Sequence, residues 1–237
     1  MSSPRSGSLK GILFDLDGTL IATRRLYVES FADALEPVLG ERLSEEQIMA
    51  RKPRAERRFL RELAGDQHVR ATLERFYASY ETRHEASFEG IYPGVRPLLQ
   101  ALRQRQVPIG LVTGKSRRSW RITGPRIGLG DFAVTVFDED VPAPKPDPTG
   151  LQLALDALCM DPDRVVYVGD SVTDLEAARA LGMPSGAVLW SKKAHEREPF
   201  SHEGRELGAR VLDHPSRVLR LLDGEDGPEE STPGSGA

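Results

Sequence analysis

Two acidic residues, Asp15 and Asp17, stand two positions apart in the run Asp-Leu-Asp-Gly-Thr-Leu, a spacing that can support chemistry. They follow residues 9–14, whose apolar side chains predict a buried strand of a parallel sheet. Open α/β sheets bind their ligands at the carboxyl ends of such strands. Because Gly18 lets the chain turn directly after the pair, the two carboxylates can face different ways. One can then attack a substrate while the other moves protons.

Two further predicted strands also end in polar residues. Residues 107–112 lead into Thr-Gly-Lys-Ser, and residues 165–168 lead into Gly-Asp-Ser-Val-Thr-Asp. Between them, Lys145 stands in the run Pro-Ala-Pro-Lys-Pro-Asp-Pro, whose prolines restrict the backbone and present the lysine from a stiff loop. Because a parallel sheet gathers its strand ends at one edge, we predict a single site there. Its members are Asp15, Asp17, Thr113, Lys145, Asp170 and Asp174.

Four carboxylates at one site repel one another and raise their own pKa values unless a cation lies between them. A hard ion with oxygen ligands, most simply Mg²⁺, relieves that repulsion and keeps waters and a substrate phosphate in its coordination shell. The metal ion and one lysine together offset the charge on a transferring phosphoryl group. Gly18, Thr19 and Gly114 are expected to aim backbone N–H groups at the phosphate from tight turns. These residues predict a Mg²⁺ cofactor and a small phosphorylated metabolite as substrate.

The remaining apolar pattern describes the elements that position these residues. From residue 92 onward helical and strand patterns alternate, which predicts an α/β fold with a doubly wound parallel sheet, a Rossmann-like core. From residue 24 to 89 the spacing is helical, which predicts a small inserted α-helical cap domain. Both ends are polar and lack hydrophobic residues, which predicts disordered tails. The predicted parts are a catalytic core of residues 9–21 and 92–222, a cap of 22–91, and tails of 1–8 and 223–237.

The composition is that of an ordinary soluble protein and narrows the choice of partners. The 237 residues are 39% hydrophobic and 29% charged with a net charge of −4, so no basic field favours nucleic acid. No stretch reaches about 18 apolar residues and the first residues are polar, so neither a membrane span nor a secretion signal is predicted. Cys159, the only cysteine, is expected to pack within a helix, which fits a reducing cytoplasm. The sequence sets no oligomeric state.

Four motifs, in this order, resemble those of the haloacid dehalogenase-like hydrolase superfamily over about residues 9–222. They are Asp-Leu-Asp-Gly-Thr-Leu, Tyr-Pro-Gly-Val, Lys-Pro-Asp-Pro and Gly-Asp-Ser with a following aspartate, a set most similar to phosphoglycolate phosphatases and their relatives. The resemblance implies that Asp15 is the nucleophile that forms an aspartyl-phosphate. It also implies that Asp17 is a general acid and base and offers its backbone carbonyl to Mg²⁺. The helical insertion resembles the family's small cap, which closes over the site and selects the substrate.

The same resemblance implies roles for the residues after the later strands. Thr113 and Lys145 would bind the transferring phosphoryl group. Asp170 would ligate the metal, and Asp174 would support the metal or the lysine from behind the ligands.

Three departures from the family pattern leave the substrate open. Gly114 stands where many relatives carry asparagine, Ile-Ala-Thr at residues 21–23 replaces a frequent acidic cap entry, and the polar stretch 191–208 is extended. We expect hydrolysis of a phosphoglycolate-type monoester, with pyrophosphate or a phosphosugar as the next candidates. A phosphomutase would use the same core with a sugar in place of water. A non-catalytic interaction module built on a phosphorylated aspartate is the alternative outside enzymes, but such single compact domains lack this cap.

Basic residues gather in one short segment of the predicted cap. Arg51, Lys52 and Arg54 are candidates to bind a carboxylate or a second phosphate of the substrate. The alternative is a solvated basic helix face, which is the commoner environment of such residues. Two other residues are expected at the surface, Lys115 beside the predicted site and His84 in the cap.

Overall fold

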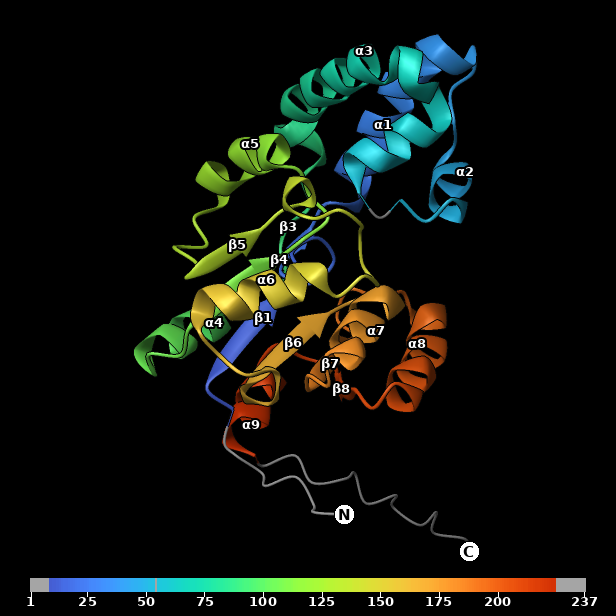
Figure 1. The fold of residues 1–237 in the computed structure, drawn as a ribbon. Coiled ribbons are helices and arrows are strands. Elements are labelled where there is room, and N and C mark those ends of the chain that lie inside the picture. Colours follow the sequence, from blue (N-terminus) through green and yellow to red (C-terminus); the bar gives the residue numbers. More distant parts are fainter. Residues whose placement is uncertain (1–8, 54, 225–237) are drawn as a thin grey trace, which may run out of the picture.

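The computed structural model describes residues 9–53 and 55–224 and shows a parallel sheet covered by helices (Figure 1). Six strands pair in the order β5-β4-β1-β6-β7-β8, and every neighbouring pair is parallel. The central strand pairs through Ile12 with Ile109 on one side and with Val166 on the other. The strands are β1 (Gly11–Phe14), β4 (Ile109–Val112), β5 (Val134–Val136), β6 (Val165–Gly169), β7 (Ser185–Val188) and β8 (Arg210–Leu212).

Helices cover both faces of this sheet, which explains why its central strands are apolar throughout. Successive residues of β1 point to opposite faces: Ile12 and Phe14 join one hydrophobic cluster and Leu13 joins another. The first cluster is closed by α4 and α9, and the second by α6 and α7. The helices of this part are α4 (Val95–Gln104), α5 (Arg117–Ile127), α6 (Thr149–Leu158), α7 (Val172–Ala180), α8 (Ala194–Glu206) and α9 (Arg217–Asp223).

Three helices form a separate layer, which we call the cap, between the short strands β2 (Ile21–Ala22) and β3 (Gly90–Ile91). The two strands pair antiparallel, so the chain enters and leaves the cap at one place. The aromatic rings of α1 and α3 stack in the centre of the cap, with the ring centroids of Phe31 and Phe76 4.9 Å apart. The cap helices are α1 (Arg24–Leu39), α2 (Glu45–Ala50) and α3 (Glu56–Ser87).

The predicted α/β class and doubly wound parallel sheet are confirmed. Strand β7 ends at Val188, before the polar stretch that begins at residue 191. In β7 the side chain of Leu212 fills the space where a Cβ of Gly186 would lie, which favours glycine there. Because glycine has no side chain, Gly186 adds nothing to the apolar pattern that indicates a strand. The polar stretch 191–208, for which no element was predicted, contains α8.

Two other expectations concern the end of a helix, at Cys159, and the ends of the chain. Cys159 does not pack within a helix: it is exposed at the end of α6, with a φ of 52° that ends the helical hydrogen bonding. Of the predicted tails, residues 1–8 and 225–237 lie outside the described residues, and Asp223 is the last residue of α9. Within the described part of the chain, no helix combines the length and apolar character needed to cross a membrane.

Candidate active site

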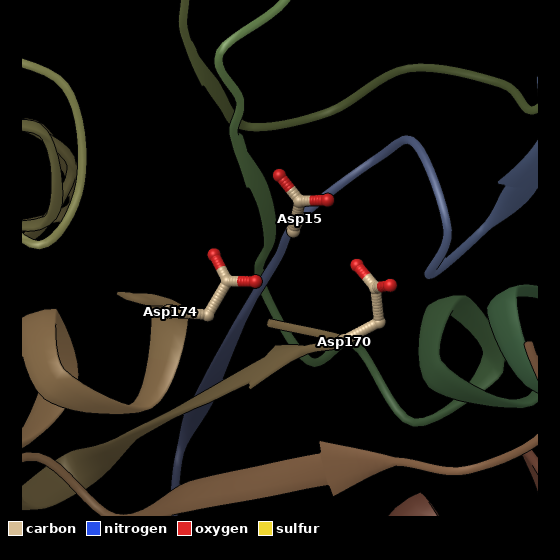
Figure 2. Close-up of side chains that lie close together, drawn as sticks. All are labelled: Asp15, Asp170 and Asp174. Atoms are coloured by element: carbon tan, nitrogen blue, oxygen red, sulfur yellow. The ribbon is translucent and has the colours of Figure 1, made fainter. Parts of the chain in front are cut away.

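The carboxyl ends of β1 and β6 bring three aspartates together. Asp15 directly follows β1, Asp170 directly follows β6, and Asp174 lies in the first turn of α7. Each offers one carboxylate oxygen, and these oxygens all lie within 4.8 Å of one another. Figure 2 shows the three side chains close together beside the ends of these strands. The topology of the sheet therefore places three of the predicted residues in one acidic cluster.

Lys145 reaches this cluster from the loop between β5 and α6. Its ammonium lies 2.7 Å from Oδ1 of Asp15 and 2.6 Å from Oδ1 of Asp174. It also donates to the hydroxyl of Tyr167 at 2.8 Å, and that hydroxyl in turn lies 3.1 Å from the carbonyl oxygen of Val112. With the backbone oxygen of Val112, 3.3 Å from the ammonium, Lys145 has four oxygen partners for its three N–H donors, and these hold it between the two carboxylates.

Burial and charge act in opposite directions on these groups. Burial raises the pKa of Asp15 well above its ordinary value, Lys145 opposes the rise, and the neighbouring aspartates add to it. Burial also raises the pKa of Asp170. Burial alone would raise the pKa of Asp174, but Lys145 and Ser171 outweigh it and lower that pKa. Lys145 itself stays charged, because Asp15 and Asp174 raise its pKa despite its burial.

The acidic cluster is a ligand set that suits a hard divalent cation. Carboxylate oxygens are the ligands that Mg²⁺ takes in proteins. Asp15 and Asp170 have raised pKa values, so positive charge between them stabilises their ionised forms. Asp170 accepts one hydrogen bond from a cation of the chain, the ammonium of Lys192 at 2.8 Å. Asp174 is engaged by Lys145 and stands beside the other two carboxylates.

The carboxylate of Asp17 lies outside the acidic cluster and faces the cap. It accepts hydrogen bonds from the hydroxyl of Thr23 at 2.7 Å, from Lys115 at 3.2 Å and from the hydroxyl of Tyr27 at 3.3 Å. Thr23 and Tyr27 belong to the start of the cap. The turn at Gly18, with a φ of 86°, thus separates the carboxylates of Asp15 and Asp17 and gives them different surroundings.

Lys115 was expected to be a surface charge, and this prediction is wrong. Its side chain is buried, with 1% of the residue exposed, and it donates to the hydroxyls of Tyr27 at 2.7 Å and Tyr80 at 2.8 Å as well as to Asp17. Both tyrosines come from the cap and cover the lysine. Three donors with oxygen partners make this burial tolerable. Burial alone would lower the pKa of Lys115, but Asp17, Tyr80 and Glu56 together outweigh it and raise that pKa above its ordinary value.

A buried carboxylate of the cap extends this contact. Glu56, at the start of α3, accepts hydrogen bonds from Tyr27 at 2.6 Å, from Ser116 at 2.5 Å and from Ser119 at 2.8 Å. Ser116 also caps α5 by accepting from the N–H of Ser119. Asp17, Lys115, Tyr27 and Glu56 therefore form a continuous polar path from the core into the cap.

The residues expected to surround the phosphate occupy the turns after β1 and β4. Thr113 directly follows β4, is buried, and lines the cavity above the cluster together with Gly114 and Gly18. A Cβ at Gly18 would lie 2.6 Å from Oδ2 of Asp170, so only glycine fits beside that carboxylate. The hydroxyl of Thr19 is buried and has no hydrogen-bond partner among the residues that the structure describes.

The structure places the basic residues of the cap in different surroundings. Lys52 lines the cavity and is exposed, whereas Arg51 is exposed and donates to the backbone oxygen of Gln47 at 2.5 Å. Arg54 lies outside the described residues. Arg58, near the start of α3, joins the cap to the core: its guanidinium donates a hydrogen bond to the carboxylate of Asp138 at 2.9 Å.

His84 was expected at the surface of the cap and is instead buried. Its Nε2 lies 3.1 Å from the hydroxyl of Thr123 in α5, and burial lowers the pKa of the imidazole. It is therefore a neutral packing residue between α3 and α5, a contact that the sequence of either helix alone could not indicate.

A cavity of about 730 Å³ opens above the acidic cluster and extends between core and cap. The strand ends supply its floor, and Tyr27, Phe31 and Met49 line it from the cap. On the core side it is also lined by Lys192 and Phe200, from the turn after β7 and from α8. Its volume lies within the range that encloses drug-sized ligands. The site can therefore hold a phosphate group at its floor and a sizeable leaving group beneath the cap.

A carboxylate at the end of the first strand, with a lysine fixed beside it and an acidic cluster next to it, suits phosphoryl transfer, which depends mainly on positioning and charge stabilisation. Residues 12–188 match the family described as haloacid dehalogenase-like hydrolase, and the chain belongs to this family. The predicted resemblance is confirmed, and with it the prediction of an enzyme: the chain is a phosphatase of this family.

Three relatives are 30–32% identical to this chain over the aligned residues. N-acetylmuramic acid 6-phosphate phosphatase of Pseudomonas aeruginosa is 30% identical over 221 residues, which are 91% of this chain and 95% of that protein. Phosphoglycolate phosphatase of Rhodospirillum rubrum is 31% identical and covers 82% of this chain and 84% of its own length. Pyrophosphatase PpaX of Bacillus pumilus is 32% identical, with 80% and 87% covered.

Solved structures share the fold at lower identity. A hydrolase from Pseudomonas syringae is 23% identical with a TM-score of 0.74, covering 92% of this chain and 100% of its own. CbbY from Rhodobacter sphaeroides, solved in complex with phosphate, is 22% identical with a TM-score of 0.74, covering 91% and 99%. These likenesses show that the arrangement of sheet and cap is that of a recurring fold.

Four residues that shape the site are not predicted from the sequence. Tyr27 and Glu56 stand in helical patterns, where nothing separates a polar contact across the cap from ordinary packing. Tyr167 fits the apolar pattern of a buried strand, so the sequence does not indicate that its hydroxyl accepts a hydrogen bond from Lys145. Lys192 lies in a polar stretch without periodicity, so only its contact with Asp170 identifies it.

Proposed function

We propose that the protein is a Mg²⁺-dependent phosphatase that hydrolyses a small phosphate monoester through an aspartyl-phosphate on Asp15. The observation that carries this proposal is the position of Lys145, 2.7 Å from Asp15 at the floor of the cavity. A carboxylate paired with a fixed cation can approach a phosphate dianion, because the cation offsets the repulsion between the two anions. The cytoplasm, with its pool of phosphorylated metabolites, is the proposed location.

Asp15 and Asp170 are the proposed ligands of Mg²⁺, with the backbone carbonyl of Asp17 as the third and Asp174 behind them. The raised pKa values of Asp15 and Asp170 support this assignment, since two such carboxylates ionise together only beside positive charge. When bound, Mg²⁺ supplies positive charge that offsets the charge of the phosphoryl oxygens.

The reaction is proposed to proceed in two displacements. In the first, an oxygen of Asp15 attacks the phosphorus and the bond to the leaving alcohol breaks, while Asp17 gives a proton to the departing oxygen. In the second, water attacks the phosphorus, Asp17 takes a proton from that water, and Asp15 is released together with inorganic phosphate. Lys145, Thr113 and the N–H group of Gly114 orient the phosphoryl group throughout. The N–H groups of Gly18 and Thr19 were expected to do the same, but they donate to the carbonyls of Ile21 at 2.8 Å and Leu16 at 3.3 Å, so they are not assigned to the phosphate.

The proposed substrate is a monoester whose leaving alcohol carries an acidic group, with phosphoglycolate as the first candidate. Phosphoglycolate and N-acetylmuramic acid 6-phosphate, named for two of the relatives, each carry a carboxylate, and pyrophosphate carries a second phosphate. A phosphosugar is the second candidate, favoured by the cavity of about 730 Å³, which exceeds the needs of a two-carbon acid. Lys52 lines the cavity and is proposed to contact the substrate from the cap. No described contact of Arg51 points to the same role.

The test is a panel of phosphorylated metabolites with Mg²⁺, in which release of inorganic phosphate and sugar products are both measured. The panel contains 2-phosphoglycolate, N-acetylmuramic acid 6-phosphate, pyrophosphate, hexose 6-phosphates and an aryl phosphate. A phosphatase releases phosphate, whereas a mutase returns an isomeric phosphosugar with little phosphate release. A non-catalytic interaction module would turn over none of them.

A further inference from the structure

The turn after β7 and the helix α8 form a wall of the cavity that lies outside the matched family segment 12–188. This turn is tied firmly to the core. Trp190 donates from its indole nitrogen to the backbone oxygen of Thr19 at 2.9 Å, and the backbone N–H of Lys192 donates to the carbonyl of Leu189 at 3.0 Å. The backbone that carries Lys192 is therefore fixed relative to the loop that follows Asp15.

Five cationic side chains line the cavity in the described part of the chain, and three of them have two or more oxygen partners within the chain. Lys145 is held by two carboxylates and a hydroxyl, and Lys115 by Asp17 and two hydroxyls. Arg24 is paired with Glu45 at 2.9 Å and with Glu196 at 3.7 Å. The lining cations are Arg24, Lys52, Lys115, Lys145 and Lys192.

Of the other two, Lys192 is the better placed to bind a substrate group. Lys52 is exposed, where water screens its charge, whereas Lys192 has 18% of its side chain exposed. Its ammonium lies 4.7 Å from the centre of the Phe200 ring and, among the described residues, donates one hydrogen bond, to Asp170. An ammonium has three N–H donors, so Lys192 retains donors for a ligand.

We propose that Lys192 is a specificity-determining residue that binds the acidic group of the leaving alcohol. This inference rests on the proposed phosphatase function and deepens it. Because Asp170 belongs to the acidic cluster of Asp15, the Lys192 ammonium stands close to the reacting phosphoryl group. A carboxylate only one or two carbons from the ester oxygen lies within its reach.

The acidic residues on the same wall do not cancel this preference. Glu196 accepts from the backbone N–H of Lys193 at 2.8 Å and pairs with Arg24, so its charge is compensated. Glu203 lines the cavity but is exposed, where solvent screens it. Lys192 is thus the cation of this wall with the strongest effect on an anion inside the cavity.

The test compares substrates that differ only in the acidic group. The pair is 2-phosphoglycolate, which carries a carboxylate, and 2-hydroxyethyl phosphate, which carries a neutral alcohol at the same carbon. Lys192→Met should lower the ratio of kcat/KM between acidic and neutral members by about tenfold to a hundredfold, the loss expected for one charge-assisted hydrogen bond. Lys192→Arg should restore most of the ratio. Lys193→Met, on the exposed neighbour, is the matched control and should leave the ratio as in the wild type.

A direct binding measurement separates recognition from turnover. In an Asp15→Asn background, calorimetry should show that Lys192→Met weakens 2-phosphoglycolate binding about tenfold and leaves 2-hydroxyethyl phosphate binding much less affected.

Parallel losses on both members of the pair would overturn the proposal and mean that Lys192 acts through Asp170. A changed ratio in Lys52→Met alone would also overturn it and assign recognition to the cap. An enzyme that hydrolyses an aryl phosphate with no preference for acidic members would refute the role of Lys192 while the phosphatase stands. No turnover of any ester would refute both.

Discussion

The ammonium of Lys115 lies 3.2 Å from Oδ1 of Asp17, and two tyrosines of the cap cover it. A lysine of the core thus holds the proposed general acid and base, and its remaining donors are satisfied only when the cap is in place. The contact links the position of the cap to the surroundings of the carboxylate that moves protons.

Lys115→Met should destabilise the protein strongly. Methionine replaces the apolar part of the side chain but leaves Asp17 and Glu56 without their buried cationic neighbour, and breaking such a pair costs about 3–5 kcal/mol of the free energy of unfolding. Urea denaturation measures the loss. Lys193→Met, at an exposed position, serves as control and should change stability by about 0.5 kcal/mol or less. Equal midpoints for the two variants would show that the Lys115 contacts contribute no stability.

Asp15→Asn should abolish turnover while the protein stays folded. The amide keeps the shape of the side chain but lacks the attacking oxyanion. Steady-state kinetics with the preferred ester and a circular dichroism melt provide the two measurements. Wild-type kcat in this variant would rule out Asp15 as the nucleophile.

Metal removal should stop the reaction reversibly. EDTA should eliminate activity and Mg²⁺ should restore it, because the pKa values of Asp15 and Asp170 are raised in the absence of positive charge between them. Asp170→Ala should raise the Mg²⁺ concentration needed for half-maximal rate or abolish activity. Ca²⁺ should support little turnover, since its longer bonds and looser geometry misplace the attacking carboxylate. Full activity in metal-free buffer would show that the reaction needs no metal ion and would rule out this assignment.

The sequence alone predicted the sheet and the floor of the site because both depend on local rules. Buried runs predict strands, the ends of parallel strands meet at one edge, and Asp15, Asp170 and Lys145 meet there accordingly. Contacts between the core and the cap follow no such rule. The burial of Lys115 depends on how α1 and α3 dock, and that orientation is set by packing rather than by the residues next to Lys115 in the chain.

Asp33→Asn should weaken the cap in a pH-dependent way. Asp33 on α1 accepts hydrogen bonds from Ser79 at 2.5 Å and from Arg83 at 3.0 Å on α3, and these contacts outweigh burial and lower its pKa from 3.8 to about 2. A lowered carboxyl pKa contributes stability that is complete above the ordinary value and is lost as pH falls toward 2. We expect the variant to be less stable by on the order of 1 kcal/mol at pH 7, after allowance for solvent screening.

The measurement for Asp33 is urea denaturation of both proteins between pH 7 and pH 3, with Asp66→Asn as the exposed control. The difference between Asp33→Asn and the wild type should shrink as the pH approaches the lower value. A difference that stays constant over this range would mean that the carboxylate charge contributes nothing.

Gly18→Ala should damage the site through two effects that a second glycine can separate. At Gly18 the backbone has a φ of 86°, and an added Cβ would also lie 2.6 Å from Oδ2 of Asp170. At Gly40, which ends α1 with a φ of 75°, an added Cβ would meet nothing within 4 Å. Both alanine variants should therefore lose about 1–2 kcal/mol of stability from the left-handed backbone. Only Gly18→Ala should also displace the Asp170 carboxylate, so kcat/KM should fall at least about tenfold, the factor that corresponds to 1.4 kcal/mol. Thermal melts and kinetics of the two variants decide the matter, and equal activities would mean that Asp170 tolerates the displacement.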